Sequence, residues 1–541
     1  MVIPTSDDGV LGRIYSSLLG ASRIARIGIP DRILKRLYTY GSLENTEEGA
    51  AFEIKNRLRD ADLTGVGRVE VDGRPIPLER VELHTRDGGV RAIDSVDKSD
   101  PIEFPVGRTV TVVLRDHELD EGEHEIELEF TTRPFGELDL VVNDRLTDEP
   151  EPITRLPREE GEDNYTEEVA RERREWLEDY ADVSLEHLGS YSIEPSDTEG
   201  NIENFTGVAQ VPVGVAGPLE VHGEHAEGEY PIPLATTEGT LVASYNRGIK
   251  ALNLSGGVTS TVVDDRMNRA PVFAFETARD AREFRDWVDD HYDEIKREAE
   301  ETSSIAELVE IEDYLTNNLA YLRFDYTTGD AAGQNMVSKA TFAACNWMLD
   351  EYPGYVENFY LEGNFATDKK HSHVNTMHTR GKRVTAEAVI PEDVVVHHLG
   401  AEPESLDRHA RIGTMGSFFS GANNNGLHAA NGLAALFVAT GQDEANIAES
   451  SAALIHAERT PGDKFRVSVT IPSLIVATYG GGTNIGTQKE CLELMGCHGA
   501  GKAREFAEVA AGVVLAGELS LASAISASDW VTSHEVYGRN R

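Results

Sequence analysis

The chain has 541 residues and 40% of them are hydrophobic, which is enough to build sizeable cores in three or four domains. Asp and Glu number 95 against 50 Lys and Arg, so the formal net charge is −45 at pH 7. Because a nucleic-acid partner requires a basic face, this balance argues against DNA or RNA binding. The acidic excess is spread along the whole chain, as suits a halophilic protein in a high-salt cytoplasm, where charge maintains solubility.

Cysteine usage and hydropathy exclude two further classes. The three cysteines, Cys345, Cys491 and Cys497, make no disulfide framework. The group Cys491, Cys497 and His498 fits no common zinc spacing, so we interpret these as small buried residues and predict no metal. The sequence has neither a run of eighteen apolar residues nor an opening signal peptide, so we expect a soluble, cytoplasmic protein without a membrane partner.

The first 150 residues read as a separate module. Residues 1–45 have the pattern of two short helices. From about residue 50 to 145 the hydropathy period changes to two, as in Thr109 to Leu114 and His124 to Phe130. We predict a small all-β sandwich or barrel of unknown role. Residues 151–164 are rich in Pro, Glu and Arg and are typical of a linker.

The stretch from Pro231 to Arg269 follows a charged helix predicted over 165–188. Thr236 and Thr237 can cap a helix that carries Glu238 in its first turn. Glu238 is then either a capping-box partner or an acid with a tuned pKa, and the window alone favours capping. The cations and the glycine turn that follow nevertheless suggest an anionic ligand.

Residues 270–362 alternate as strand, helix, strand, strand, helix, strand, the order of a ferredoxin-like unit. The second helix begins at the small-residue stretch Asp330–Met336. Small residues at a helix start let a phosphate approach the free N–H groups, although a tight strand–helix turn explains the stretch equally well. The GxGxxG motif of the dinucleotide fold is absent here.

The remaining residues supply polar groups on loops between apolar helices. Gly363 to Lys370 is a polar loop with adjacent lysines. An apolar helix that ends at Gly441-Gln442-Asp443 belongs in the centre of a domain, since it is apolar nearly all round. A small-residue helix, Val513 to Ser526, contains Glu518, and His534 follows on the C-terminal tail.

Taken together, these stretches resemble the hydroxymethylglutaryl-CoA reductase family, from about Glu203 to Arg539. The matching pieces are ENFTGVAQVPVGVAGPL, PLATTEGTLVASYNRG, VVDDRMNR, TGDAAGQNM, GNFATDKK, RGKRVTAEAVIP, LHAANGLAALFVATGQD, TYGGGTN, LAGELSL, and SH before the final NR. Residues before Glu203 lie outside this resemblance. The resemblance implies reduction of hydroxymethylglutaryl-CoA to mevalonate and CoA, on the route to isoprenoids, with two molecules of NADPH.

The resemblance also assigns catalytic roles to Glu238, Lys369, Asp443 and His534. An ammonium such as that of Lys369 stabilises the oxyanion formed by hydride addition. His534 can protonate the departing thiolate, and Glu238 can give a proton to the aldehyde oxygen if its pKa is raised. Asp443 is the neighbour that raises it and that keeps Lys369 charged.

The binding residues are implied in the same way. The substrate's hydroxy-acid end is expected to contact Arg269, Asp368, Lys370, His428 and Asn431, and its carboxylate Arg411, which replaces the family's usual lysine. The phosphates of CoA or of the cofactor are expected to contact Ser244, Asn246 and Arg247. The NADPH site is expected to be lined by Asp330, Gly333, Asn335, Met336 and Ser303.

The implied fold is a mixed α/β one, with a large catalytic domain (165–269 and 363–541) around a central helix and an inserted NADPH domain (270–362). A homodimer or homotetramer with active sites between subunits is expected. Three departures from the family stand out: Glu362, His371-Ser372-His373 and Asn423-Asn424-Asn425. They leave two alternatives open, a reductase of a related acyl-CoA thioester and a non-catalytic homologue that acts as a binding module.

Overall fold

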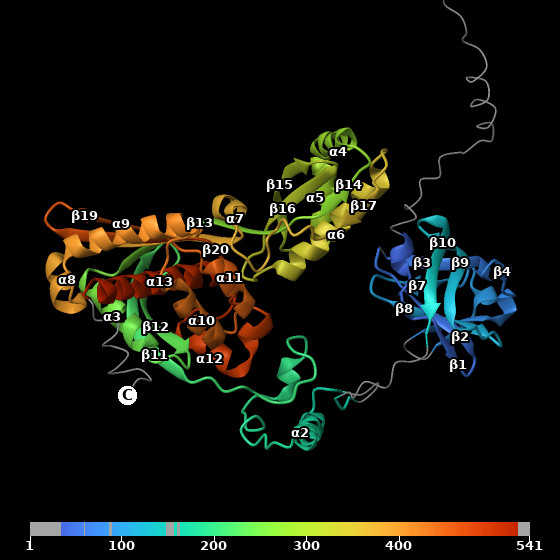
Figure 1. Cartoon of the computed structure of the whole chain (residues 1–541), viewed down its shortest axis with the longest axis horizontal. Helices are drawn as coiled ribbons and strands as arrows, with labels where there is room; N and C mark the ends of the chain where they lie inside the picture. The colour runs from blue at the N-terminus through green and yellow to red at the C-terminus, as the bar shows by residue number, and fades with distance from the viewer. Residues whose placement is uncertain (1–33, 59, 86–88, 148–155, 159–162, 528–541) are drawn as a thin grey trace, which may run out of the picture. The chain divides into compact units, whose positions relative to one another are not determined.

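The computed structural model describes residues 34–58, 60–85, 89–147, 156–158 and 163–527, and these residues form two compact units (Figure 1). The first unit comprises Met1–Pro150, Ala274–Asp280 and Cys345–Phe359. The second comprises Glu151–Phe273, Ala281–Ala344 and Tyr360–Arg541. Each unit has its own hydrophobic core, so the two are described in turn.

The first unit is built on an all-β sandwich, as the period of two predicts. One sheet has the order β1-β2-β8-β5-β6, and the other has β10-β9-β3-β4 with β7 beside β3. Strand β10 alternates almost perfectly between buried and exposed residues, because one face packs on the core and the other meets water. The strands are β1 Glu44–Thr46, β2 Gly49–Lys55, β3 Ala61–Val71, β4 Arg74–Pro75, β5 Val81–Thr85, β6 Val90–Ala92, β7 Ile102–Phe104, β8 Thr109–Arg115, β9 Gly122–Arg133 and β10 Gly136–Leu146.

The two helices predicted over residues 1–45 fall mostly outside the described residues. From residue 34 onward the chain makes a short 3-10 turn, Lys35–Leu37, and then strand β1. The predicted linker over 151–164 is likewise described only in part.

Contacts inside the first unit join the sandwich to a later segment of the chain. The side-chain amide of Asn346 donates to the Leu58 carbonyl at 2.7 Å, and the Arg36 guanidinium donates to Asn358 Oδ1 at 2.9 Å. The Arg36 guanidinium also lies 5.9 Å from the centre of the Phe359 ring. The sandwich therefore packs against residues of the segment 345–359, a connection that its sequence did not indicate.

The second unit begins with helix α2 (Glu167–Ala181). The Thr166 side chain accepts a hydrogen bond from the Val169 N–H at 3.3 Å and so caps the helix start. The helix stops where Asp182 adopts the left-handed conformation, with φ of 52°. It is therefore shorter than the helix predicted over 165–188.

Three helices cross at the centre of the second unit: α3 (Leu241–Leu254), α10 (Ala429–Thr440) and α13 (Ala503–Ser526). A Cβ atom on Gly248 of α3 would meet the Ala516 carbonyl oxygen of α13 at 2.0 Å. Tyr245 fills the space between α10 and α13, since Cβ atoms on Gly432 and Gly517 would both collide with its ring. Small residues at these crossings let the backbones approach, which confirms a core built around apolar helices.

Helix α13 is long and apolar enough to cross a membrane by length and composition, but 78% of that stretch is buried inside the protein. Its neighbours α3 and α10 provide the packing that a buried core helix requires. The burial therefore accounts for its composition.

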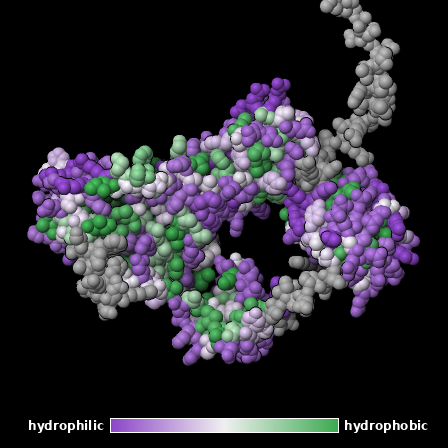
Figure 2. All heavy atoms as spheres, in the orientation of Figure 1, coloured by the Kyte–Doolittle hydropathy of each residue, from purple (hydrophilic) through white to green (hydrophobic). Residues whose placement is uncertain are grey.

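A twisted sheet covers these helices, with β16-β13-β18-β20-β19 as neighbours in order and β11 running parallel to β13 (Figure 1). Besides β14 and β17, whose bounds are given below, its strands are β11 Val213–Gly223, β12 Glu227–Ala235, β13 Val258–Arg269, β15 Glu307–Thr316, β16 Leu319–Thr327, β18 Gly381–Ile390, β19 Leu454–Thr460 and β20 Lys464–Leu474. The later part of the unit also contains α7 His373–His378, α8 Glu392–Leu399, α9 Pro403–Ser420, α11 Ile447–Ser450 and α12 Gly486–Leu494. The visible surface is largely hydrophilic, in keeping with the excess of carboxylates (Figure 2).

The stretch 270–362 has the predicted order of elements, with its first helix divided in two. The elements are β14 Val272–Ala274, α4 Ala278–Asp290, α5 Tyr292–Glu300, β15, β16, α6 Gln334–Glu351 and β17 Asn358–Tyr360. Strands β15 and β16 form an antiparallel hairpin, and β16 joins the large sheet through β13. Its treatment as an inserted cofactor domain stays a prediction.

Candidate active site

The N-terminal end of α10 holds a buried carboxylate. Glu518 of α13 accepts hydrogen bonds from the backbone N–H groups of Leu427, His428 and Ala429 at 2.7–2.9 Å. These are the N–H groups that a helix start leaves free, so the carboxylate completes the helix. Burial raises the pKa of Glu518, while the three N–H groups oppose that rise.

His428 stands at the same helix end with its imidazole largely buried. The ring stacks on Tyr245 with centroids 4.9 Å apart, and Nε2 lies 3.5 Å from the Ser244 hydroxyl. Burial lowers the pKa of His428 to about 4, so the ring is neutral at physiological pH. A neutral imidazole can orient a substrate hydroxyl without adding charge.

Glu238 lies beside this helix end, but outside helix α3. Its N–H donates to the Thr236 hydroxyl at 3.0 Å, and α3 starts three residues later, after Thr240 in a left-handed conformation. The prediction that Thr236 and Thr237 cap this helix with Glu238 in its first turn is therefore wrong. The exposed Glu238 carboxylate instead accepts both hydrogen bonds of the Asn431 amide, at 3.1 and 3.2 Å.

Three polar residues of α3 make internal contacts. Ser244 lies 3.0 Å from the Ser520 hydroxyl, and Arg247 donates to the Ser520 carbonyl at 2.6 Å. Asn246 Oδ1 accepts from the N–H of Gly217, whose φ of 90° belongs to the tight turn between the two halves of β11. Asn246 therefore supports that turn, while Ser244 and Arg247 connect α3 to α13 through Ser520.

The loop 362–370 presents Lys369 to the C-terminal end of α10. The ammonium is hydrogen-bonded to the Asp443 carboxylate and to Asn446 Oδ1, the latter at 2.8 Å. Asn364, Thr367 and Lys369 all have positive φ, between 55° and 60°. Such backbone conformations are unfavourable for these residues and occur where the structure must hold a side chain in one direction, here the Lys369 side chain.

Beneath Lys369 lies a buried ion pair that sequence patterns did not reveal. Glu449 Oε1 accepts from Arg380 at 2.6 Å and from the Lys369 N–H at 3.3 Å. Arg380 also lies 2.9 Å from Asp368 Oδ1. Burial raises the pKa of Glu449 to about 7, against the lowering effect of Arg380. This pair fixes the backbone of the lysine loop.

Arg269 faces the other side of the same loop. Its guanidinium donates to Glu362 Oε2 at 3.0 Å and lies 3.7 Å from Asp368 Oδ2. Lys370 turns away and donates to Asn364 Oδ1 at 2.9 Å. The cation expected to hold the substrate is thus already paired with Glu362, the residue that departs from the family pattern.

The turn before α6 has the small residues expected of a phosphate contact. Gly333 has φ of 81°, and a Cβ there would collide with Thr328. Asn335 is exposed and Met336 half-buried. Asp330 accepts from the Gly501 and Ala503 N–H groups at 2.7 and 3.1 Å, so it secures the start of α13.

Ser303 closes the turn after α5. Its hydroxyl oxygen accepts hydrogen bonds from the Ile305 and Ala306 N–H groups at 3.1 and 3.2 Å. This role shapes the turn next to the exposed Ser304.

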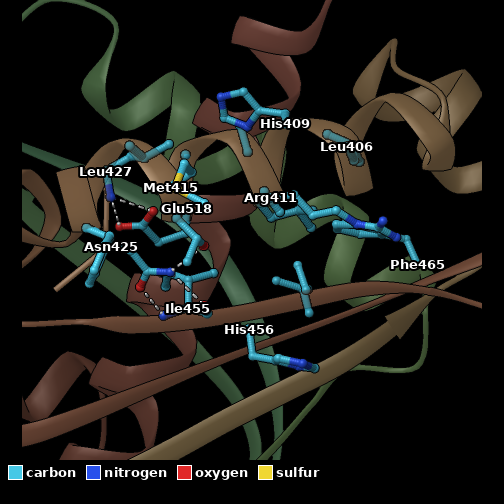
Figure 3. Close-up of a pocket in the computed structure, with 18 residues that line it drawn as sticks. Leu406, His409, Arg411, Met415, Asn425, Leu427, Ile455, His456, Phe465 and Glu518 are labelled. Atoms are coloured by element: carbon cyan, nitrogen blue, oxygen red, sulfur yellow. Dashed lines mark hydrogen bonds between the residues drawn. The ribbon is translucent and has the colours of Figure 1, made fainter.

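Arg411 lies on helix α9, apart from both loops. It pairs with Asp407 at 2.7 Å and its side chain is 78% exposed. It lines a cavity of about 600 Å³ between α9, β19, β20 and α13. Figure 3 shows Glu518 and Asn425 at one end of this cavity, hydrogen-bonded to Leu427 and Ile455, and Arg411 extending toward Phe465. The contacts of Arg411 do not include the other predicted substrate residues that the structure describes.

Around α10 the predicted catalytic residues that the structure describes, together with the predicted substrate-binding residue Asn431, therefore form two groups. Glu238 and Asn431 lie at the start of α10, and Lys369 and Asp443 lie just past its end. A helix rises about 1.5 Å per residue, so Asn431 and Thr440 are about 14 Å apart along the axis. His534 lies outside the described residues.

Comparison with protein families identifies both parts of the chain. The family model described as hydroxymethylglutaryl-coenzyme A reductase matches residues 169–539. A second, described as hydroxymethylglutaryl-CoA reductase, N-terminal domain, matches residues 33–147. The expectation that residues before Glu203 lie outside the resemblance is therefore wrong.

Individual relatives agree. The 3-hydroxy-3-methylglutaryl-coenzyme A reductase of Pyrococcus abyssi is 44% identical over 375 residues, which cover 68% of this chain and 92% of that protein. The reductase of Haloferax volcanii is 41% identical over 377 residues, covering 69% and 93%. A solved class II reductase from Streptococcus pneumoniae, bound to NADPH, shares the fold with a TM-score of 0.51 at 19% identity, over 66% of this chain and 96% of that one. The chain belongs to the hydroxymethylglutaryl-CoA reductase family.

Proposed function

We propose that the chain reduces (S)-3-hydroxy-3-methylglutaryl-CoA to mevalonate and CoA with two molecules of NADPH. The observation that carries this proposal is the Lys369 ammonium, which is held by Asp443 and Asn446. An ammonium has three N–H bonds, and two are used in these contacts. The third can donate to the thioester oxygen as negative charge develops there.

The residues at the start of α6 fit a nicotinamide cofactor. Gly333 permits the tight turn into α6, since its φ is 81° and Thr328 packs where a Cβ would lie. The first N–H groups of α6 have no partner within the helix and are available to a phosphate. Bound NADPH supplies the two hydrides. Lys369 stabilises the oxyanion in both reductions, and Asp443 keeps the ammonium charged.

Two proton transfers remain for the chain's own groups. The first reduction releases a thiolate, which His534 protonates as CoA departs. The second reduction leaves an alkoxide on the former aldehyde carbon, which Glu238 protonates. The Asn431 amide contacts both oxygens of Glu238 and so fixes the direction of this side chain, which donates from its protonated, carboxylic acid form.

NADPH oxidation assayed with hydroxymethylglutaryl-CoA and with a panel of other acyl-CoA thioesters tests the assignment. We expect turnover with hydroxymethylglutaryl-CoA. The Glu362–Arg269 pair favours one second candidate, a reductase of a related thioester without the distal carboxylate, and turnover only with such thioesters would select it. Absence of NADPH oxidation with every thioester would instead select a binding module.

The separation of the two catalytic groups along α10 supports active sites shared between two copies of the chain. If Lys369 of one copy meets Glu238 of another, two inactive variants can complement each other. Co-expression of Lys369→Ala and Glu238→Gln chains is expected to restore about a quarter of wild-type activity, through dimers with one intact site. Activity no higher than that of the separate variants would favour sites within one copy.

The cofactor preference rests on residues 303 and 304. The Ser303 hydroxyl is engaged with backbone N–H groups, and Ser304 beside it is exposed. A 2′-phosphate is usually contacted by a guanidinium, so we expect a preference for NADPH over NADH that is smaller than in enzymes with an arginine. Kinetics with both cofactors measure it, and equal efficiency would rule out discrimination by the serines.

The acidic surface suits a high-salt cytoplasm. Screening shortens the range of repulsion between carboxylates, so the folded state gains stability as salt rises. We expect unfolding in low-salt buffer and recovery at molar salt. A melting temperature that does not change with salt would contradict this expectation.

The N-terminal β-sandwich is proposed to serve assembly, solubility or partner binding. A chain that starts near Gly161 is expected to keep the lysine loop and α10, which belong to the second unit. It lacks Leu58 and Arg36, which are hydrogen-bonded to Asn346 and Asn358, so lower stability is expected. A folded but inactive truncated chain would show that the sandwich contributes to the active site.

A further inference from the structure

One buried amide joins the start of α6 to the lysine loop. Asn446 is 1% exposed, and its Oδ1 accepts hydrogen bonds from Lys369 Nζ and from Gln334 Nε2, both at 2.8 Å. A carbonyl oxygen has two lone pairs, so both are used. The Asn446 Nδ2 is buried and has no hydrogen-bond partner among the residues that the structure describes.

This arrangement leaves the orientation of the Asn446 amide dependent on its two donors. If the amide turned by 180°, Nδ2 would face both Lys369 and Gln334, and three donors would meet without an acceptor. Nothing else within the described part of the chain holds Nδ2 in place. The side-chain amide N–H of Gln334 therefore helps to keep Asn446 Oδ1, rather than Nδ2, directed toward the Lys369 ammonium.

Gln334 is well placed for this task because it is the first residue of α6. Its backbone carbonyl accepts from the Arg269 guanidinium at 3.3 Å and from the Ser338 hydroxyl at 2.7 Å. The residue is thus anchored through its main chain, while its side chain reaches Asn446. It connects the proposed cofactor turn with both the catalytic lysine and the arginine of the substrate site.

We propose that Gln334 is a positioning residue that fixes the Lys369 ammonium through Asn446. This inference rests on the proposed function, in which Lys369 acts on the thioester oxygen. Asp443 provides the charge that holds the lysine, whereas the Gln334–Asn446 pair sets the direction of its remaining N–H.

The variant Gln334→Met tests the proposal, since methionine has a similar length and no donor. We expect kcat to fall about tenfold, the size of one misplaced hydrogen bond in a transition state, with KM and the melting temperature nearly unchanged. The matched control is Gln488→Met on α12, for which wild-type kinetics are expected. Wild-type kcat in Gln334→Met would overturn the proposal.

A second substitution distinguishes orientation from general disruption. In Asn446→Asp both carboxylate oxygens accept, so the direction of the group no longer depends on Gln334. We expect Asn446→Asp to restore most of the kcat lost in Gln334→Met. A double variant no better than Gln334→Met would show that Gln334 acts through packing and would overturn the proposal.

A third measurement does not depend on turnover. Lys369 can be modified by an amine-reactive reagent and the extent followed by mass spectrometry of the peptide, with Lys370 in the same peptide as internal control. Gln334→Met is expected to change the Lys369 rate severalfold relative to Lys370, and an unchanged ratio would overturn the positioning role. Absence of wild-type turnover with hydroxymethylglutaryl-CoA, together with a changed ratio, would reject the proposed function and retain the positioning role.

Discussion

The two ends of helix α10 differ in the charge that they hold and in how complete they are. At its N-terminal end the Glu518 carboxylate accepts three backbone N–H groups, and it is 3% exposed. Just past its C-terminal end the Lys369 ammonium contacts Asp443, and these side chains are 35% and 44% exposed. The helix dipole favours an anion at the first end and a cation at the second.

The difference shows which charges stabilise the fold and which remain available for chemistry. The Glu518 carboxylate stabilises the fold, because its hydrogen bonds complete the helix start. The Lys369 side chain is 35% exposed, so a substrate oxygen can reach its ammonium. Glu238 is exposed beside the N-terminal end of α10. Like Lys369, it would be enclosed only by a bound substrate or by another protein surface.

The largest expected effect comes from removing the cation. Lys369→Ala is expected to lower kcat by about 1,000-fold, because the oxyanion loses its charged donor. Steady-state NADPH oxidation measures it, and circular dichroism checks the fold. Lys489→Ala, on exposed α12, is the matched control. Turnover near the wild-type value in Lys369→Ala would remove the C-terminal end of α10 from the active site.

The next effect tests the other end. Glu238→Gln keeps the shape of the side chain but cannot give a proton, so a loss of about 100-fold in kcat is expected. Binding of NADPH should persist, since the cofactor turn belongs to α6. Single-turnover measurements should show the aldehyde accumulating, and unaltered reduction of the free aldehyde would contradict the proton-donor role.

A smaller effect is expected at Glu362. Its carboxylate occupies the Arg269 guanidinium at 3.0 Å and competes with an anionic substrate group. Glu362→Ser is therefore expected to lower KM for hydroxymethylglutaryl-CoA about tenfold at fixed ionic strength, whereas Glu490→Ser on α12 should leave KM unchanged. A higher KM in Glu362→Ser would mean that Glu362 orients Arg269 for the substrate instead.

Sequence patterns predicted the β-sandwich and the apolar core helices because each has a local period. They did not predict Arg380 and Glu449, whose pairing joins residues far apart in the chain. The capping prediction at Glu238 failed since Asn431, a distant residue, takes the carboxylate. Asn446 and Gln334 also gave no local signal, because their roles arise only where α6 and the end of α10 meet.

The smallest effect concerns the buried N-terminal end of α10 and its response to acid. Burial lowers the pKa of His428 from 6.5 to about 4 in the folded chain. Below about pH 6.5 the unfolded chain binds a proton at this histidine while the folded chain does not, so stability falls as the pH falls toward 4.

Between pH 7.5 and 5.5 this single group should remove about 1 kcal/mol of stability, and His428→Gln should lack that part of the loss. The comparison uses the pH slope of unfolding by denaturant at constant high salt, so the lost stacking on Tyr245 shifts both pH points equally. Glu449 titrates in the same window but is present in both chains, and its contribution cancels. Identical pH slopes for the two chains would mean that His428 takes up its proton in the folded state. The N-terminal end of α10 would then be more accessible to solvent than its packing against Glu518 and Tyr245 indicates.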